Sequence, residues 1–314
     1  MAVIGLLHSG SKKNFIKPVA ALTKALGKGV TIKSEYAEDK LKKMRIIAEE
    51  LVRDPSVEVI VAAGGPEPAL AALRASDRLQ RTKPRQDRKP IVFTAVTDPK
   101  GSGLVKTLKK PGGNATGMAG HTSELDPERL KLLNQLVPHD GKKRARTFGV
   151  LTRRGREHVA AQYAAVKKEA KKLGLKLKRA NVDTNKGVEL AFEAFQKQTV
   201  AVVVTADAFF NNRRAQIVAL AARHKLPAIY QWREFGDAGG LVSFGPSLLE
   251  AYEKAGACAA KILAGKKPSQ IPVSNPSKFD LFVNSETAQK LGIKVPKALG
   301  GHKIQPIKKA KSKK

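Results

Sequence analysis

Strand-like and helix-like segments alternate along almost the whole chain, and this alternation constrains the fold more than any other feature. Residues 2–7 form a short apolar run typical of a buried strand, and apolar residues then recur at helical spacing between 15 and 26. The same two patterns return through 30–63 and again up to 96. Because strand–helix–strand units of this length connect parallel strands, the pattern predicts a parallel sheet with helices on both faces.

A second copy of the pattern follows a turn cluster at 111–114. It begins with a helix near 127–137, and its expected strands lie at 147–152, 175–182, 200–205 and 227–231, with helices at 155–173, 186–198 and 212–224. The pattern repeats, although the residues themselves do not. With 314 residues the chain is long enough for two domains. We therefore predict an α/β fold of two doubly wound parallel-sheet lobes.

The remaining segment holds too few elements for a third lobe. One strand is expected at 240–244, one helix at 248–263, and another strand and short helix at 279–291. We assign residues 1–118 and 240–266 to the first lobe and 119–239 and 267–297 to the second, and expect 298–314 to be a disordered basic tail. The chain then crosses three times, near 118–122, 236–240 and 266–272, and adjacent crossings make a hinge.

The net charge is strongly positive, because 59 Lys and Arg face 27 Asp and Glu, which gives +32. Such a charge suits nucleic acid or an anionic membrane surface. However, the chain has no zinc-finger spacing, and an aromatic content of 5% is small for base stacking. We expect no specific nucleic-acid partner. A basic protein that binds polyanions or a membrane surface stays open as an alternative.

Motifs for catalysis and for metal binding are absent from the sequence. There is no nucleophile elbow, phosphate-binding loop or dinucleotide glycine fingerprint. The histidines are scattered, and none lies at ligand spacing from a carboxylate or cysteine. The single cysteine, Cys258, excludes an internal disulfide and is expected to be a small buried side chain. We predict a protein that is not an enzyme and that has no cofactor and no metal site.

Ligands of parallel sheets bind beyond the carboxyl ends of the strands, and in the first lobe this rule selects three loops. They contain the candidate ligand contacts Ser9, Gly10, Ser11, Gly64, Gly65, Pro66, Thr97 and Asp98. Free backbone N–H groups at the start of the following helices suit a carboxylate or a phosphate. A tight turn at the glycines and a helix cap at Asp98 explain the same residues without a ligand.

The corresponding loops of the second lobe are rich in aromatic residues. Their candidate contacts are Arg153, Asp207, Phe209, Tyr230 and Trp232. Asp98 or Asp207 could bind an ammonium group and Arg153 a carboxylate, although Asp207 could equally cap a helix and Phe209 could belong to the core. The two sets of loops together predict a small zwitterionic or anionic solute, amino-acid-like, with an aromatic side chain as one option. Hinge closure would enclose it in a cleft between the lobes.

Several segments resemble the family of ABC-transporter substrate-binding proteins of the tryptophan/tyrosine-binding lipoprotein type. The longest are Lys-Pro-Gly-Gly-Asn-Ala-Thr-Gly at 110–117, Leu-Ala-Ala-Arg-His-Lys-Leu-Pro-Ala-Ile-Tyr at 220–230 and Ala-Gly-Gly-Leu-Val-Ser-Phe-Gly-Pro-Ser at 238–247. Shorter matches lie at 48–52, 128–133, 206–210, 232–235 and 267–273. The resemblance extends over about residues 2–297 in the family's order.

This resemblance implies a type I periplasmic-binding fold with three crossovers. It also implies a monomer that delivers a small solute to a membrane permease driven by a separate ATPase, in the periplasm or anchored on the extracellular side of a membrane. The chain shows no export signal, so either the protein is cytoplasmic or the signal has been removed, and the resemblance favours removal. The implied ligand contacts are Ser9, Gly65, Thr97, Asp98, Asp207, Tyr230 and Trp232.

One turn departs from the family pattern and bears on the ligand. Arg153-Arg154-Gly155-Arg156 stands where family members usually carry Asn or Asp-rich turns, which favours a more anionic solute. A ligand-sensing partner of a signalling protein would share the fold and the cleft, and stays open as a further alternative.

Overall fold

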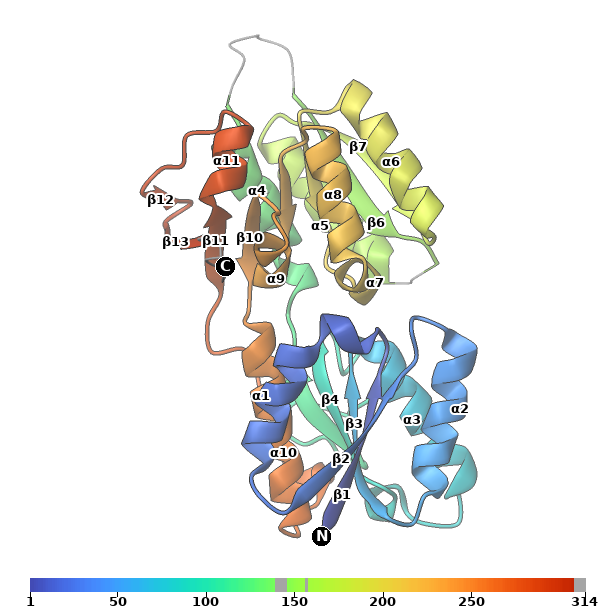
Figure 1. Ribbon diagram of the computed structural model, residues 1–314. Coiled ribbons are helices and arrows are strands. Elements are labelled where there is room, and N and C mark those ends of the chain that lie inside the picture. The colour runs from blue at the N-terminus through green and yellow to red at the C-terminus, as the bar shows by residue number, and fades with distance from the viewer. Residues whose placement is uncertain (139–145, 156–157, 308–314) are drawn as a thin grey trace. The chain divides into compact units, whose positions relative to one another are not determined.

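The chain divides into two compact units in the computed structural model, which describes residues 1–138, 146–155 and 158–307 (Figure 1). Unit 1 comprises Met1–His121 and Leu248–Ser277, and unit 2 comprises Thr122–Ser247 and Lys278–Lys314. The chain therefore passes from one unit to the other at three junctions, 121–122, 247–248 and 277–278. This connectivity is that of the predicted three-crossover hinge, with shifted boundaries.

Unit 1 is built on a five-stranded parallel sheet with the order β2-β1-β3-β4-β5. Its strands are β1 (Ala2–His8), β2 (Val30–Tyr36), β3 (Val57–Ala63), β4 (Ile91–Val96) and β5 (Ala115–Ala119). Helices α1 (Ile16–Leu26) and α10 (Leu248–Leu263) pack together on one face, and α2 (Leu41–Arg53) and α3 (Pro66–Leu79) on the other (Figure 1). Short 3-10 turns lie at Lys12–Asn14, Arg85–Asp87 and Pro268–Gln270.

The apolar patterns of the sequence explain this packing. Val59–Ala63 is buried throughout, as expected for a strand covered on both faces. The helical stripe Met44, Ile47 and Leu51 of α2 is buried against the sheet. Cys258 on α10 is also buried, and burial raises the pKa of its thiol to about 11. The expected buried small side chain is therefore confirmed.

Unit 2 contains an eight-stranded sheet with the order β12-β13-β11-β10-β9-β8-β6-β7. Its strands are β6 (Thr147–Arg153), β7 (Lys176–Val182), β8 (Ala201–Val204), β9 (Ala228–Tyr230), β10 (Val242–Gly245), β11 (Asp280–Asn284), β12 (Ala298–Leu299) and β13 (His302–Ile307). Neighbours are parallel except for the β10–β11 and β12–β13 pairs.

The helices of unit 2 follow its strands in the predicted order. They are α4 (Asp126–Leu136), α5 (His158–Lys172), α6 (Asn185–Gln198), α7 (Ala208–Asn212), α8 (Arg214–Arg223), α9 (Arg233–Asp237) and α11 (Ser285–Lys290), with a 3-10 turn at Ser123–Leu125. The single helix predicted at 212–224 is in fact preceded by a separate short helix, and Arg213 lies between α7 and α8. No helix among the described residues is both long enough and apolar enough to cross a membrane.

The strand at 242–245 belongs to unit 2, and its predicted assignment to the first lobe is wrong. It pairs in parallel with β9 and antiparallel with β11, whereas only the following helix, α10, joins unit 1. Apolar periodicity shows that a strand is present but carries no information about which sheet it joins. The crossing therefore follows β10, at 247–248, instead of preceding it.

The predicted boundary at 266–267 also differs from the structure. Residues 267–277 stay in unit 1, where Ser274 forms an isolated bridge with Met118. The amide of Ala119 donates to the Ser274 carbonyl (2.8 Å), so this segment lies beside β5 and covers the sheet edge. The strand β5 itself had not been predicted, because it follows directly on the turn cluster at 111–114.

The last segment is only partly as expected. Residues 298–307 form β12 and β13, and β13 pairs in parallel with β11, so this stretch is not a disordered tail. Ile307 is buried, and a Cβ on Gly236 would overlap its Cδ1. The strands were missed because Leu299, Ile304 and Ile307 do not alternate regularly with polar residues, and the lysines of this segment are typical of a disordered tail. Residues 308–314 of the predicted tail lie outside the described part of the chain.

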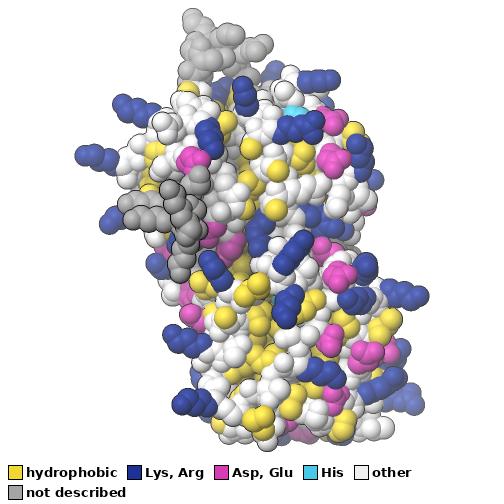
Figure 2. Space-filling model, viewed as in Figure 1, with side chains coloured by type: hydrophobic (Ala, Val, Ile, Leu, Met, Phe, Trp, Pro, Cys, Tyr) yellow, Lys and Arg dark blue, Asp and Glu magenta, His cyan; other side chains and the backbone are white. Residues whose placement is uncertain are grey.

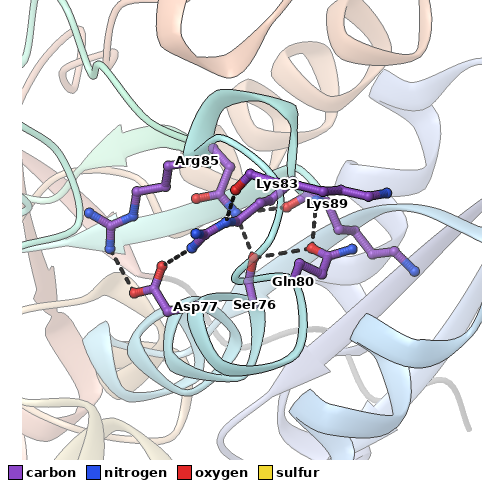
Figure 3. Close-up of polar contacts among 8 residues, drawn as sticks. Ser76, Asp77, Gln80, Lys83, Arg85 and Lys89 are labelled. Atoms are coloured by element: carbon purple, nitrogen blue, oxygen red, sulfur yellow. Dashed lines mark hydrogen bonds and ion pairs between the residues drawn. The ribbon is translucent and has the colours of Figure 1, made fainter.

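A polar network holds the segment that joins α3 to β4, at the amino-terminal edge of the unit 1 sheet (Figure 3). The Asp77 carboxylate accepts from Arg85 Nη2 (2.9 Å) and from Arg88 Nη1 (2.5 Å). Gln80 Oε1 accepts from the Lys89 amide (2.9 Å). These bonds order residues 80–90 at the opposite end of the strands from the edge where ligands bind.

Candidate functional site

The strand orders of both sheets fix where each unit can bind a ligand. The chain leaves β1 for β2 on one side and later returns to β3 on the other side, and it does the same at β6, between β7 and β8. Loops that diverge at such a switch point open a crevice at the carboxyl ends of the strands. We call the loops at 8–11, 36–40, 64–67 and 94–98 rim 1, and those at 152–155, 205–214 and 230–235 rim 2. Of the turn Arg153-Arg154-Gly155-Arg156, which departs from the family pattern, the structure describes the first three residues, and Arg156 lies outside the described residues.

Rim 1 is centred on a direct contact between Ser9 and Gly64. Ser9 Oγ donates to the Gly64 carbonyl (2.6 Å), which joins the loops after β1 and β3. Gly64 and Gly65 have φ of +87° and +104°, so the tight-turn explanation of the glycines is confirmed. Pro66 opens α3, which has no side-chain cap at its start. Because Pro66 and Pro68 have no backbone N–H, only Glu67 and Ala69 contribute N–H groups in the first four positions of α3, and these two suit an anionic group.

The buried residue His8 holds the loop that carries Ser9 in place. The Gly10 amide donates to His8 Nδ1 (2.9 Å), so His8 carries its proton on Nε2 and donates it to the hydroxyl of Tyr252 on α10 (2.7 Å). The His8 ring also packs on Phe15. Burial lowers the pKa of His8 to about 3, which keeps the ring neutral. His8 is therefore a structural residue that fixes the position of Gly10.

The loop after β2 forms a part of rim 1 that sequence reasoning missed. Its amides at Ala37, Glu38 and Asp39 donate to the carbonyls of His8, Gly10 and Ser9, at 2.8, 3.2 and 2.6 Å. Glu38 and Asp39 have φ of 53° and 61°, a strained region for residues other than glycine. These bonds place the acidic residue Asp39 next to Ser9. No sequence signal marks this turn, because neither Gly nor Asn is present.

The other candidates of rim 1 are more peripheral. Asp98 is exposed, and its Oδ1 accepts from the Gly101 amide (2.8 Å) while its carbonyl accepts from Ser102 Oγ (2.6 Å). Asp98 therefore caps a turn and not the expected helix, since residues 99–103 form no helix. Ser11 precedes the 3-10 turn at Lys12–Asn14 without a side-chain cap bond, and Thr97 is half-buried directly after β4. Their contact with a solute stays a prediction.

Rim 2 is dominated by one aromatic ring between two arginines. The Asp207 carboxylate caps α7 by accepting from the Phe209 amide (2.7 Å), as the cap interpretation predicts. The guanidinium carbons of Arg153 and Arg213 lie 3.9 and 3.6 Å from the centre of the Phe209 ring. Two groups this close to one centroid must occupy its opposite faces. Cation–π attraction therefore holds both positive charges against the Phe209 ring, two residues after Asp207.

Arg213 was not among the predicted contacts. It follows Phe209 by four residues, but it was expected at the second position of the helix at 212–224, and the short helix at 208–212 that precedes it was not predicted. The structure also brings Arg153 from β6 to Phe209 from the loop after β8. The Arg153 contact therefore joins the loops after β6 and β8, whereas the Arg213 contact lies within the loop after β8.

The remaining aromatic candidates are buried. Tyr230 is fully buried and stacks on Phe235, with ring centres 4.6 Å apart at 9°. Burial raises the pKa of its phenol, and its hydroxyl has no hydrogen-bond partner among the described residues. Trp232 is the residue before α9 and is 5% exposed. Both side chains of this loop of rim 2 are thus buried, and their contact with a solute stays a prediction.

Metal chemistry finds no support in the described part of the chain, where no group of three or more His, Cys, Asp or Glu side chains could hold a metal ion. Figure 2 shows Lys and Arg side chains spread over the visible face, with Asp and Glu side chains between them. On this face the distribution is that of a solvated basic surface rather than of a compact anion-binding patch.

Residues 11–304 match the family described as ABC transporter substrate binding protein, so the chain belongs to this family. Its members are binding proteins and not enzymes. Proteins of this family bind a small molecule and act together with a membrane transporter. They lie outside the cytoplasmic membrane or are anchored to it.

Individual relatives agree with this assignment. A tyrosine-binding protein of Clostridioides difficile (strain R20291) is 27% identical over 304 residues, which cover 97% of this chain and 83% of the relative. A ligand-free, open substrate-binding protein with adhesive properties from Clostridium difficile is 26% identical with a TM-score of 0.67, covering 99% of this chain and 100% of that one.

A structure from Streptococcus pneumoniae, solved in complex with L-Trp, has a TM-score of 0.79 at 24% identity and covers 94% and 96% of the two chains. A periplasmic sugar-binding protein from Pseudomonas fluorescens shares the fold at 12% identity, with a TM-score of 0.61 and coverage of 93% and 89%. These likenesses confirm the predicted type I periplasmic-binding fold.

Proposed function

We propose that this chain is the solute-binding component of an ABC importer and binds a small amino-acid-like solute with both rims. The proposal rests on one observation above all: each sheet presents chemically complementary groups at its switch point, hydroxyl and amide donors on rim 1 and an aromatic ring with arginines on rim 2. The tyrosine-binding relative and the L-Trp complex support an aromatic amino acid as the first solute to test.

The rims divide the solute's groups between them. The Glu67 and Ala69 amides at the start of α3 suit the carboxylate, since helix N-termini bind anions through backbone N–H groups. Ser9 would donate to the carboxylate only after giving up its bond to the Gly64 carbonyl. Asp39 and Asp207 are the acidic residues that could receive an ammonium group, and Asp39 has the advantage of lying next to Ser9. Arg153 and Arg213 favour a solute with additional negative charge. A zwitterion and an anion are both compatible with this set.

The proposed partners and location follow from the importer role. The chain would act as a monomer and deliver the solute to a membrane permease, with a separate ATPase driving transport. It would do so in the periplasm or anchored at the outer face of a membrane. Hinge closure over the three junctions would remove the solute from water before delivery.

Calorimetric titration with L-tryptophan and L-tyrosine tests this function. We expect saturable binding of at least one of them with one site per chain, and a melting temperature that rises with solute concentration by mass action. D-Glucose serves as a control without carboxylate or ammonium. Absence of binding by both amino acids and by small aromatic carboxylates would contradict the proposed solute class.

Polyanion or membrane-surface binding is the second candidate, and the charge of +32 favours it. It predicts affinity for DNA or anionic vesicles that falls steeply with salt. A truncation that removes residues 308–314 leaves β13 intact, whereas one beginning at 302 would delete that strand. Loss of salt-sensitive binding in the shorter truncation would support a role of the lysine-rich end, and unchanged binding would argue against it.

A further inference from the structure

Beneath the loop that follows β8 lies a fully buried ion pair that the sequence did not reveal. Asp126 and Arg129 are both 0% exposed at the start of α4, and Arg129 Nη1 donates to Asp126 Oδ1 (2.5 Å). Burial raises the pKa of Asp126, while the Arg129 charge and hydrogen-bond donors oppose that rise. A buried pair of this kind is a weak source of stability, because both charges lose their hydration. Stability alone therefore does not explain why this pair is buried, and its other hydrogen bonds indicate a further role.

Asp126 and Gln162 bond to the amide and to the carbonyl of Ala206, a residue of rim 2. Asp126 Oδ2 accepts from the Ala206 amide (3.3 Å) and from Gln162 Nε2 (2.6 Å). Gln162 Nε2 also donates to the Ala206 carbonyl (3.2 Å), and Gln231 Nε2 donates to the carbonyl of Asp207 (3.0 Å). The backbone at 206–207, which sets the positions of the Asp207 carboxylate and the Phe209 ring, is thus held by three side chains.

The basic partner holds two chain segments that continue into the junctions. Arg129 Nη1 donates to the Thr122 carbonyl (2.7 Å), and Arg129 Nε donates to the Phe244 carbonyl (2.8 Å). Thr122 is the first residue of unit 2 after one junction, and Phe244 lies on β10 shortly before the next. One guanidinium group therefore ties two of the three junction segments to the carboxylate that holds Ala206.

We infer that Arg129 and Asp126 are positioning residues that couple the solute-contacting loop after β8 to the chain segments entering the hinge. The inference rests on the proposed function, because it assumes that rim 2 contacts solute. Arg129 fixes Asp126, Asp126 fixes Ala206, and a displacement of Asp207 or Phe209 is transmitted through these bonds to Thr122 and Phe244. Gln162 bonds to Asp126 and to the Ala206 carbonyl, and none of its described contacts reaches Thr122 or Phe244.

A double variant, Asp126→Leu with Arg129→Met, tests the coupling while avoiding an unpaired buried charge. Replacing a buried ion pair by apolar residues is often tolerated, so this variant is expected to fold. Arg146→Met is the matched control, because Arg146 is 9% exposed in the same unit, bonds to backbone carbonyls, and lies before β6 at the opposite edge of the sheet. Gln162→Leu removes the bonds of Gln162 to Asp126 and Ala206 but leaves Arg129 bonded to Asp126, Thr122 and Phe244.

Hydrogen exchange without solute gives the first readout. In the double variant we expect the Ala206 amide to exchange about tenfold faster, since it loses its acceptor, and residues 122–123 and 244–247 to exchange faster with it. Gln162→Leu should affect 206–209 alone, and Arg146→Met neither region. Unchanged exchange at 206 and 122 in the double variant, or equal effects in Arg146→Met, would overturn the inference.

Exchange in the presence of saturating L-tryptophan and, separately, L-tyrosine gives the second readout. In the wild type, a bound amino acid should protect residues 206–210 together with residues 122–123. In the double variant, protection should persist at 206–210 and disappear at 122–123. Protection of both regions in the variant would show that the ion pair does not couple them. If neither amino acid binds the wild type, the aromatic solute class fails, while the first readout still decides the positioning role.

Discussion

Replacing Gly64 by alanine probes the centre of rim 1 most sharply. Gly64 has φ of +87°, a region where a side chain is strained by about 1–2 kcal/mol. The added Cβ would also overlap Ser9 Oγ and lie 2.9 Å from His8 Cε1. His8 is held by two hydrogen bonds, so Ser9 has to rotate and lose its bond to the Gly64 carbonyl, which removes about 1 kcal/mol more.

The expected total is a loss of about 2–3 kcal/mol in the free energy of unfolding of unit 1. At roughly 2–4 °C per kcal/mol for a domain of this size, its melting temperature should fall by roughly 4–12 °C. Gly27→Ala is the matched control, because Gly27 has φ of +85° in the same unit with nothing within 4 Å of an added Cβ. It carries only the backbone strain of about 1–2 kcal/mol and should lower the melting temperature by about 2–8 °C, which is less than Gly64→Ala at the same value per kcal/mol.

Differential scanning calorimetry of both variants and of Ser9→Ala, alone and combined with Gly64→Ala, completes the test. Because Ser9→Ala removes the overlapping atom, the double variant should be more stable than the sum of the single losses predicts. Equal melting temperatures for Gly64→Ala and Gly27→Ala would refute the contact between Ser9 and Gly64 as the feature that requires glycine here.

The other predictions concern pH, the arginine stack and affinity. Because burial lowers the pKa of His8 to about 3 from a usual 6.5, stability from neutral His8 is complete above pH 6.5 and is lost as the pH falls toward 3. Acid unfolding monitored by circular dichroism should show a shallower loss in His8→Gln, and an unchanged profile would contradict this. Phe209→Leu removes both guanidinium contacts and should destabilise unit 2 by about 1–2 kcal/mol in urea titrations, whereas a change near zero would show that the stack contributes nothing. Trp232→Ala should weaken solute affinity by about 2 kcal/mol, or roughly thirtyfold, in calorimetry, and an unchanged affinity would remove Trp232 from the site.

The regular elements could be predicted from the sequence because their signals are local. The apolar stripe Met44–Ile47–Leu51 and the helix at 248–263 are recognisable without knowledge of their neighbours, and the latter matches α10 to the residue. Sheet membership is not local, which is why the strand at 242–245 was placed in the wrong lobe. Its partners β9 and β11 are separated from it by about 12 and 35 residues of chain.

The candidate site was predictable to the level of loops. The rule for parallel sheets located Ser9, Gly64 and Phe209 at the switch points, but it could not show that Ser9 bonds to Gly64 or that Arg213 stacks on Phe209. Asp39 was not predicted as a site residue because its left-handed conformation depends on hydrogen bonds to the loop after β1, which form only in the folded chain. The pairing of Asp126 with Arg129 was equally hidden, since acidic and basic residues three apart on a helix are commonly exposed.

Hydrogen exchange of the wild-type chain with and without L-tryptophan tests most directly whether two separate sets of loops serve one solute. The proposed function predicts that saturating amino acid slows exchange at 9–11 and 64–67 in unit 1 and at 206–210 in unit 2, with a common dependence on concentration. Protection confined to one unit, or different concentration dependences for the two, would contradict it.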